Sequence, residues 1–264
     1  MKYFGGCDVG STYTKAVILD ETGKICADTT IKSKINSEVS AKLAMEEVLN
    51  KVGLKSSKDL CYLIGTGYGR NKVPFADENI SEISCHAMGV HVTDPGVKAI
   101  IDIGGQDVKG ISVDTDGTVK NFAMNDKCAA GTGRFYEAMA RSFEMSLPEF
   151  SNLSLTAKNV IPITAQCTVF AESEVISQLA VGTDKRDIIN GIHKSVAGRV
   201  GGLCNRVGVR DLVVMTGGVA QNHGIVKALQ SQLGHEIHTS PLTQYNGALG
   251  AAIFAYQKAL KQQQ

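Results

Sequence analysis

The most constraining feature of this sequence is an internal repeat. Residues 8–23 and 102–117 both follow the pattern Asp-apolar-Gly-x4-Lys-x-apolar-x-apolar-Asp-x-x-Gly, and the two segments align without a gap. Agreement by chance at eight spaced positions is improbable, so the pattern indicates a duplication. A duplicated chain is expected to fold into two related halves.

Each copy of the repeat predicts three consecutive strands joined by similar turns. An apolar run ends in Asp-x-Gly, a glycine-rich turn follows, and an alternating strand leads through a hairpin turn to a third strand. Later in each half, a further strand stops at Thr-Gly. The predicted strands are 3–9, 16–19, 25–31 and 60–64 in the first half, and 97–103, 110–113, 119–123 and 212–215 in the second.

Helical patterns fill the segments between these strands. They cover residues 37–51, 134–144, 171–179, 187–207, 224–233 and 248–260. Strands and helices in a duplicated chain predict an α/β fold of two lobes with a nucleotide cleft between them. The expected first lobe is 1–95 together with a C-terminal helix at about 248–264, and the expected second lobe is 96–247.

The composition narrows the class of protein. The chain has 264 residues, and 27 Lys and Arg residues nearly balance 26 Asp and Glu residues, giving a formal net charge of +1. This balance gives no electrostatic footprint for a nucleic acid or an anionic membrane. No stretch approaches the ~18 apolar residues of a membrane span, and Lys2 and Asp8 argue against a secretory signal. We therefore expect a soluble cytoplasmic protein, with no nucleic acid or membrane as a partner, whose seven cysteines are reduced.

The repeated Asp-x-Gly turns are suited to hold phosphate groups. Each turn follows a strand and exposes backbone N–H groups, which can cradle phosphates. The first turn adds the hydroxyls of Ser11 and Thr12 and the cation of Lys15, and the second adds Gln106 and Asp107. One such turn from each lobe would hold the phosphates of a nucleotide from both sides.

A carboxylate stands at the end of the strand before each turn. Asp8 and Asp102 can hold hydrated Mg2+ or orient a water for hydrolysis. The residues alone leave open whether Asp8, Asp102 or Gln106 positions the attacking water. The P-loop pattern Gly-x4-Gly-Lys-Ser/Thr is absent, and so is a complete Gly-x-Gly-x-x-Gly fingerprint with its acidic partner.

The duplicated pattern resembles that of the actin, sugar kinase and heat-shock ATPase superfamily, whose duplicated fold is ribonuclease-H-like. There the two Asp-x-Gly copies contact phosphate and Mg2+-bound water, and a Gly-Gly turn lies near the nucleoside. The resemblance implies ATP or ADP and Mg2+ as ligands, with Asp8 and Asp102 at Mg2+ through water. The nucleotide-binding residues that it implies are Gly10, Ser11, Thr12, Lys15, Gly104, Gly105, Gln106, Asp107, Gly217, Gly218, Gln221 and Gly247.

Longer motifs resemble the activator (component A) of 2-hydroxyacyl-CoA dehydratases, a BadF/BadG/BcrA/BcrD-type ATPase. These motifs are residues 66–70, 124–134 and 167–177. In that family two cysteines from each of two identical subunits hold one [4Fe-4S] cluster at the dimer axis, and ATP hydrolysis drives a low-potential electron into the dehydratase. The resemblance implies Cys128 and Cys167 as cluster ligands, a homodimer, and reduced ferredoxin or flavodoxin as the electron donor.

The two cysteines also have a case that rests on the residues. Each precedes a predicted helix, where free N–H groups stabilise a thiolate, and Thr168 is the expected N-cap of the second helix. A cubane needs about four thiolates, so a two-fold axis would supply the other half. On the residues alone, a catalytic thiol and a buried structural cysteine stay open. Glu172 and Glu174 are expected just inside the helix start. The cysteines expected to serve packing are Cys7, Cys26, Cys61, Cys85 and Cys204.

Two alternative functions stay open from the sequence. The nearer one is an ATP-driven reductase component for another iron–sulfur acceptor, such as a double-cubane protein or an aryl-CoA reductase. The more distant one is a small-molecule kinase of the same fold, for which Asp107 is the loop carboxylate available as a base. In the activator interpretation, rotation of the lobes around ATP changes the angle between the helices at the cluster.

Overall fold

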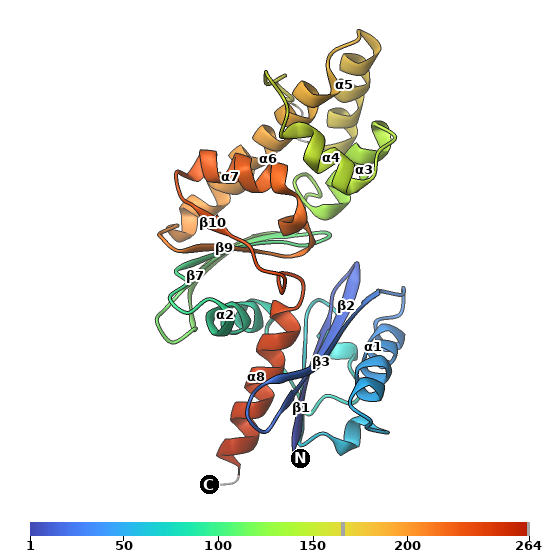
Figure 1. The fold of residues 1–264 in the computed structure, drawn as a ribbon, viewed down its shortest axis with the longest axis vertical. Coiled ribbons are helices and arrows are strands. Elements are labelled where there is room, and N and C mark those ends of the chain that lie inside the picture. The colour runs from blue at the N-terminus through green and yellow to red at the C-terminus, as the bar shows by residue number, and fades with distance from the viewer. Residues whose placement is uncertain (165–166, 263–264) are drawn as a thin grey trace. The chain divides into compact units, whose positions relative to one another are not determined.

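Two units, each built around one five-stranded sheet, make up residues 1–164 and 167–262, which the computed structural model describes (Figure 1). Unit 1 comprises Met1–Gly96, Asp114–Val119 and Gln244–Gln264, and unit 2 comprises Val97–Val113 and Lys120–Thr243. The division into lobes at 95/96 and about 248 stays a prediction, and its residues 263–264 lie outside the described part of the chain.

The sheet of unit 1 has the strand order β3-β2-β1-β4-β5. Strands β1, β2 and β3 are antiparallel, whereas β4 runs parallel to β1 and β5 parallel to β4. The strands are β1 (Tyr3–Val9), β2 (Tyr13–Asp20), β3 (Ile25–Lys32), β4 (Tyr62–Thr66) and β5 (Glu78–Asn79). The helices are α1 (Ser37–Lys51), α2 (Glu82–Thr93) and α8 (Asn246–Lys261), with 3-10 turns at Ser57–Asp59 and Arg70–Lys72.

Helices α1 and α8 cover opposite faces of this sheet. Ile18 packs with the apolar residues of α1, whereas its neighbours Val17 and Leu19 pack with α8, as the alternation of side chains along a strand requires. Helix α8 lies against both β1 and α2 (Figure 1). A Cβ at Gly6 would overlap the backbone of Ala248, so only glycine allows this approach of α8 to the sheet.

The sheet of unit 2 has the strand order β10-β9-β6-β7-β8. Its strands are β6 (Ala99–Ile103), β7 (Val108–Val113), β8 (Val119–Asn125), β9 (Val213–Thr216) and β10 (Ile237–His238). Helices α6 and α7 pack together over it, and one apolar core joins the sheet to all five helices (Figure 1). The helices are α3 (Gly133–Ser142), α4 (Leu147–Ser154), α5 (Thr168–Ala180), α6 (Lys185–Val207) and α7 (His223–Leu233), with a 3-10 turn at Gly218–Gln221.

The repeat in the sequence is also a repeat in three dimensions. Both sheets place two antiparallel strands of the repeat beside a parallel strand that ends in Thr-Gly. Asp8 lies opposite Lys15 and Thr66 in the first sheet, and Asp102 lies opposite Lys109 and Thr216 in the second. The α/β fold with a duplicated core is therefore confirmed.

Several local predictions differ from the structure. The strand predicted from residue 60 begins at Tyr62, because Ser56 and Asp59 form a capping box around a 3-10 turn just before it. Helix α4 was not predicted, although its Ser146 and Glu149 form a second capping box. The packing role expected for Cys26 and Cys61 is wrong, since both side chains are exposed.

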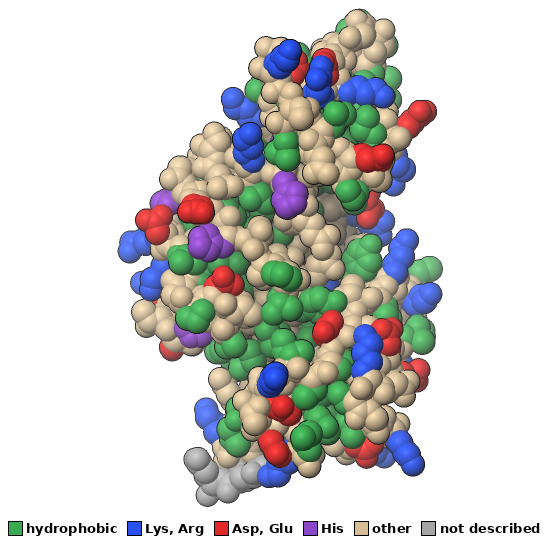
Figure 2. Space-filling view, in the orientation of Figure 1, with side chains coloured by type: hydrophobic (Ala, Val, Ile, Leu, Met, Phe, Trp, Pro, Cys, Tyr) green, Lys and Arg blue, Asp and Glu red, His purple; other side chains and the backbone are tan. Residues whose placement is uncertain are grey.

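The surface of the drawn face carries mixed charge, with Lys and Arg interspersed among Asp and Glu (Figure 2). Among the residues that the structure describes, no helix combines the length and apolarity needed to cross a membrane.

Candidate functional site

The first turn, between β1 and β2, is closed by its own hydrogen bonds. The Gly10 N–H donates to Tyr13 O at 3.2 Å, and the Ser33 hydroxyl donates to Gly10 O at 2.7 Å. The Ser33 N–H also donates to Thr12 O at 2.9 Å. Thr12 Oγ1 is buried and has no hydrogen-bond partner within residues 1–164 and 167–262. Since buried hydroxyls are normally hydrogen-bonded, this atom is suited to meet a ligand.

A largely buried ion pair supports the first turn. Lys15 Nζ lies 3.0 Å from Asp8 Oδ2. The Asp8 side chain is 5% exposed and that of Lys15 is 17% exposed, so the lysine retains an open side. An ammonium group placed in this way beside a glycine turn can bind a phosphate oxygen as well as the carboxylate.

Two glycines make room for the Asp8 carboxylate. Gly67 has a φ of +89°, and a Cβ there would overlap Asp8 Oδ1. A Cβ on Gly247 would lie 2.9 Å from Asp8 Oδ2 and 3.0 Å from His86 Nε2. His86 thus lies beside the same carboxylate, a placement that sequence reasoning missed. Gly247 is the sequence feature that could have indicated a close contact here, but only the packing of α8 shows that Asp8 and His86 are the neighbouring side chains.

The second turn, between β6 and β7, holds a denser cluster of charges. Lys109 Nζ lies 3.2 Å from Asp102 Oδ2 and 2.8 Å from Asp107 Oδ2. The Thr216 hydroxyl donates to Asp102 Oδ1 at 2.9 Å. The Asp102 and Lys109 side chains are almost fully buried, whereas Gln106 is exposed at the turn. Lys109 therefore fixes two carboxylates near a turn whose glutamine faces solvent.

The N-terminus of α3 is bound directly to the second turn. The Gly133 N–H donates to Gly104 O at 2.8 Å, and the Arg134 N–H donates to Gly105 O at 3.0 Å. A Cβ on Gly133 would lie 3.2 Å from Gly104 O, tighter than ordinary contact. The chain enters this helix from Cys128, and four residues separate the cysteine from Gly133, whose N–H binds the turn.

The residues predicted to lie near the nucleoside belong to two different units. Gly217 (φ +84°) ends β9, and its N–H donates to Thr243 O at 3.0 Å. Gly218 and Gln221 are exposed on the 3-10 turn that follows. These three residues belong to unit 2, whereas Gly247 lies beside Asp8 in unit 1.

A buried histidine supports the segment after this turn. Asn222 Oδ1 accepts from the N–H groups of Gly224 and Ile225, so its amide nitrogen donates to His193 Nε2 at 3.1 Å. His193 packs against Tyr136 and Phe150. Burial lowers the pKa of His193 to about 3, so the ring is neutral at pH 7.

Cys128 is half-buried against the core of unit 2. Its carbonyl oxygen accepts from Asn125 Nδ2 at 3.2 Å, and its sulfur accepts from Arg199 Nη1 at 3.6 Å. Cys167 is exposed and is itself the N-cap of α5, so the N-cap expected at Thr168 is wrong by one residue. Neither cysteine forms a disulfide within the described residues.

Helix α5 presents an apolar surface next to Cys167. Four of its exposed side chains are Val169, Phe170, Ile176 and, at the helix end, Val181, with exposed fractions of 65%, 69%, 53% and 78%. Glu172 and Glu174 lie beyond the first turn, unlike the prediction. They accept hydrogen bonds from the Ser142 hydroxyl and the Thr164 N–H, respectively. These carboxylates therefore bind neighbouring chain segments rather than the helix terminus.

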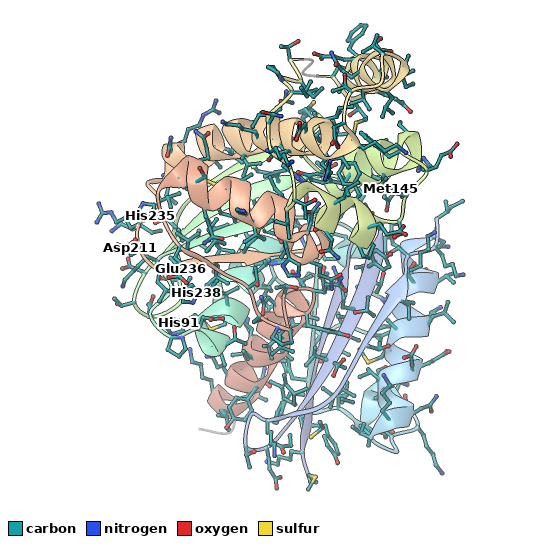
Figure 3. All side chains as sticks on the ribbon, turned by 45° about the horizontal axis from the view of Figure 1, so that its top comes forward. His91, Met145, Asp211, His235, Glu236 and His238 are labelled. Atoms are coloured by element: carbon teal, nitrogen blue, oxygen red, sulfur yellow. The ribbon has the colours of Figure 1, made fainter. Side chains whose placement is uncertain are left out.

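Three other cysteines are buried, and burial raises the pKa of Cys7, Cys85 and Cys204, which keeps these thiols protonated. Within residues 1–164 and 167–262, no group of three or more His, Cys, Asp or Glu side chains could hold a metal ion. His235 pairs with Asp211 at 2.5 Å, and both lie at an edge of unit 2 with Glu236 and His238 (Figure 3). Cys128 and Cys167, which the sequence predicts as cluster ligands, belong to no such metal-binding group within the described residues.

Residues 6–255 match the BadF/BadG/BcrA/BcrD ATPase family. The chain is 53% identical over 260 residues to the "(R)-2-hydroxyglutaryl-CoA dehydratase activating ATPase" of Acidaminococcus fermentans, covering 98% of this chain and 99% of the relative. It is 48% identical to the "Activator of lactoyl-CoA dehydratase" of Anaerotignum propionicum, covering 98% and 99% of the two chains.

Solved structures share the same fold. The activator of the 2-hydroxyisocaproyl-CoA dehydratase from Clostridium difficile, with bound ADPNP, has a TM-score of 0.93 and 46% identity, covering 99% of this chain and 97% of that one. A ROK family glucokinase from Streptomyces griseus has a TM-score of 0.59 at 13% identity, covering 97% and 99%, and shows the fold alone. The actin-like ATPase and sugar kinase fold expected from the duplicated turns is confirmed.

Proposed function

Because the chain belongs to the BadF/BadG/BcrA/BcrD ATPase family and is an ATPase activator of 2-hydroxyacyl-CoA dehydratases, we propose that it is an ATP-driven one-electron donor. Two copies would share one [4Fe-4S] cluster and pass a low-potential electron to the dehydratase. The observation that carries the proposal is the hydrogen-bonded link between the second turn and the segment that begins at Cys128.

The two turns supply the groups that ATP hydrolysis requires. The N–H groups and hydroxyls of the first turn, with Lys15, bind phosphate oxygens. Asp8 and Asp102 are the carboxylates that would hold hydrated Mg2+, and one of them or the exposed Gln106 would orient the attacking water. Nucleoside binding is assigned in this proposal to Gly217, Gly218, Gln221 and Gly247, as the family resemblance implies.

Cys128 and Cys167 fit the ligand set of the cluster. Neither forms a disulfide, the sulfur of Cys128 accepts a hydrogen bond from the guanidinium of Arg199, and Cys167 lies at the N-terminus of α5. When bound, the cluster supplies the one-electron carrier that no side chain of this protein provides.

A second copy of the chain would complete this site. Two cysteines provide half of about four ligands, and an isologous interface repeats both of them. The exposed apolar side chains of α5 next to Cys167 are a surface that such an interface would bury.

A displacement of the second turn that follows the bound nucleotide is transmitted to Cys128 along the chain in this proposal. The Gly133 and Arg134 N–H groups bind the carbonyls of Gly104 and Gly105, so a shift of the turn on phosphate release pulls the start of α3. The same displacement moves the segment from Cys128. This connection gives ATP hydrolysis a mechanical route to the electron-transfer site.

The remaining partners follow from this role. Reduced ferredoxin or flavodoxin would supply the electron, and the dehydratase would accept it. A cytoplasmic location belongs to the same proposal, because cysteines stay reduced in that compartment.

The first test is iron and acid-labile sulfide in anaerobically purified protein, with the molar mass in solution. We expect a dimer with about four irons and a brown chromophore that air bleaches. Cys128→Ala and Cys167→Ala should lose the iron and retain ADP binding, whereas Cys61→Ala, at another exposed cysteine, should retain both. Full iron occupancy in either ligand variant would contradict the assignment.

The acceptor is tested by mixing the activator, ATP, Mg2+ and dithionite with a purified 2-hydroxyacyl-CoA dehydratase. The proposal predicts ATP-dependent dehydration of the acyl-CoA. Iron-free protein that transfers the γ-phosphate to a metabolite would instead identify a kinase.

A further inference from the structure

Arg199 lies on the middle of α6, the longest helix of unit 2. Its neighbours Val196 and Val200 are buried in the core, which fixes the rotation of the helix and directs the arginine toward the segment before α3. Arg199 is half-buried, and its Nη1 donates to Cys128 Sγ at 3.6 Å. The contact joins residues 71 positions apart, so tertiary packing alone produces it.

Arg199 differs from two other arginines of unit 2, which pair with carboxylates. Arg134 pairs with Glu137, and Arg186 pairs with Asp184. Within residues 1–164 and 167–262, no Asp or Glu forms an ion pair with Arg199. Its positive charge and its N–H donors therefore act mainly on the sulfur of Cys128.

We propose that Arg199 is a positioning residue that acts through Cys128 to raise the reduction potential of the bound cluster. The inference rests on the proposed function, since it takes Cys128 as a ligand. Reduction adds one negative charge to the cluster and its thiolates. A cationic N–H donor at one ligating sulfur stabilises that extra charge, and hydrogen bonds to cluster sulfurs tune the potential in this direction.

The two cysteines of one chain would then differ in environment. Cys128 receives a guanidinium, whereas Cys167 stands at the exposed N-terminus of α5. In a symmetric dimer each Cys128 would carry its own Arg199, so two cations would face one cluster.

The test is the midpoint potential of the dimer, measured by anaerobic redox titration for Arg199→Gln, Arg199→Lys and wild type. Arg199→Gln removes the charge and should make reduction about tenfold less favourable, which is a shift of about 59 mV toward negative potential for one electron. Arg199→Lys keeps the charge but loses the planar fork, and should shift the potential less. Arg206→Gln, at an exposed arginine farther along α6, is the control and should leave the potential unchanged.

Iron content and ADP affinity, measured on the same samples, separate the possible failures. Absence of iron from the wild type overturns the proposed function and this inference with it. Iron at wild-type occupancy with an unchanged potential in both Arg199 variants overturns this inference alone. If Arg199→Gln loses iron while ADP binding is kept, a shifted potential in Arg199→Lys supports the inference, and an unchanged one overturns it.

Discussion

The two copies of the repeat share strand order and register, yet they use their lysines differently. Lys15 pairs with Asp8 and keeps an open side, whereas Lys109 is almost fully buried between Asp102 and Asp107. The threonine that lies opposite each aspartate also has a different partner in the two units. Thr216 donates to the Asp102 carboxylate, whereas Thr66 donates to the carbonyl of Ile80.

One repeated pattern thus serves two purposes in the two units. In unit 1 the cation remains accessible and can bind a ligand. In unit 2 the ammonium group of Lys109 is buried and holds two carboxylates close to each other. A repeated pattern therefore gives the placement of the groups, but their partners decide what they do.

Lys109→Met should have the largest effect on this comparison. It leaves two neighbouring carboxylates without their cation, and breaking a buried pair costs about 3–5 kcal/mol. The free energy of unfolding from a denaturant titration at pH 7 measures the loss. Lys15→Met leaves one carboxylate and should cost about 1–3 kcal/mol. Equal losses in the two variants would show that the copies are equivalent.

Lys15→Met should have its main effect on nucleotide binding. A charge-assisted hydrogen bond contributes about 1.5–3 kcal/mol, so affinity for ADP should fall about tenfold to hundredfold. Isothermal titration calorimetry measures the change, and Lys24→Met, at an exposed lysine of the following hairpin, is the control. An unchanged affinity of Lys15→Met for ADP would contradict the proposed role of the first turn in phosphate binding.

The two threonines offer a smaller test of the same difference. Thr216→Val removes a donor to a buried carboxylate and should cost about 1.5–3 kcal/mol, whereas Thr66→Val removes a donor to a carbonyl and should cost about 0.5–1.5 kcal/mol. Unfolding titrations of both variants give the comparison. A larger loss for Thr66→Val would reverse our interpretation of the two turns.

Unit 2 should also carry a distinct pH dependence through His193. Its pKa is about 3 in the folded protein and about 6.5 in the unfolded chain, so the unfolded chain takes up the proton first. The contribution of His193 to the free energy of unfolding is fully present well above pH 6.5 and falls as the pH decreases toward 3, by about 1 kcal/mol at pH 5.5. His193→Gln should flatten this part of the pH profile, whereas the exposed His238→Gln should not. A slope that persists in His193→Gln would assign the effect to other groups.

The sequence predicted the strands of the repeat well, because their alternation and turns are local. The strand over 3–9 and the helix over 37–51 match the structure at both ends. Prediction was weaker where a short polar cap interrupts the pattern, as before β4, and for α4. The exposure of Cys26 and Cys61 could not be predicted, because it depends on which elements cover a strand edge.

The sequence by itself determined the duplication and the positions of the Asp-x-Gly turns, since both follow from residue spacing, whereas Cys128 and Cys167 were predicted as ligands from the resemblance of the motifs around them. Only the tertiary structure placed Gly247 and His86 at Asp8, gave Lys109 two carboxylates and brought Arg199 to Cys128. The physical reason is that strand register follows from a local period of two residues. Contacts between helices distant in the sequence follow from how side chains fill one core.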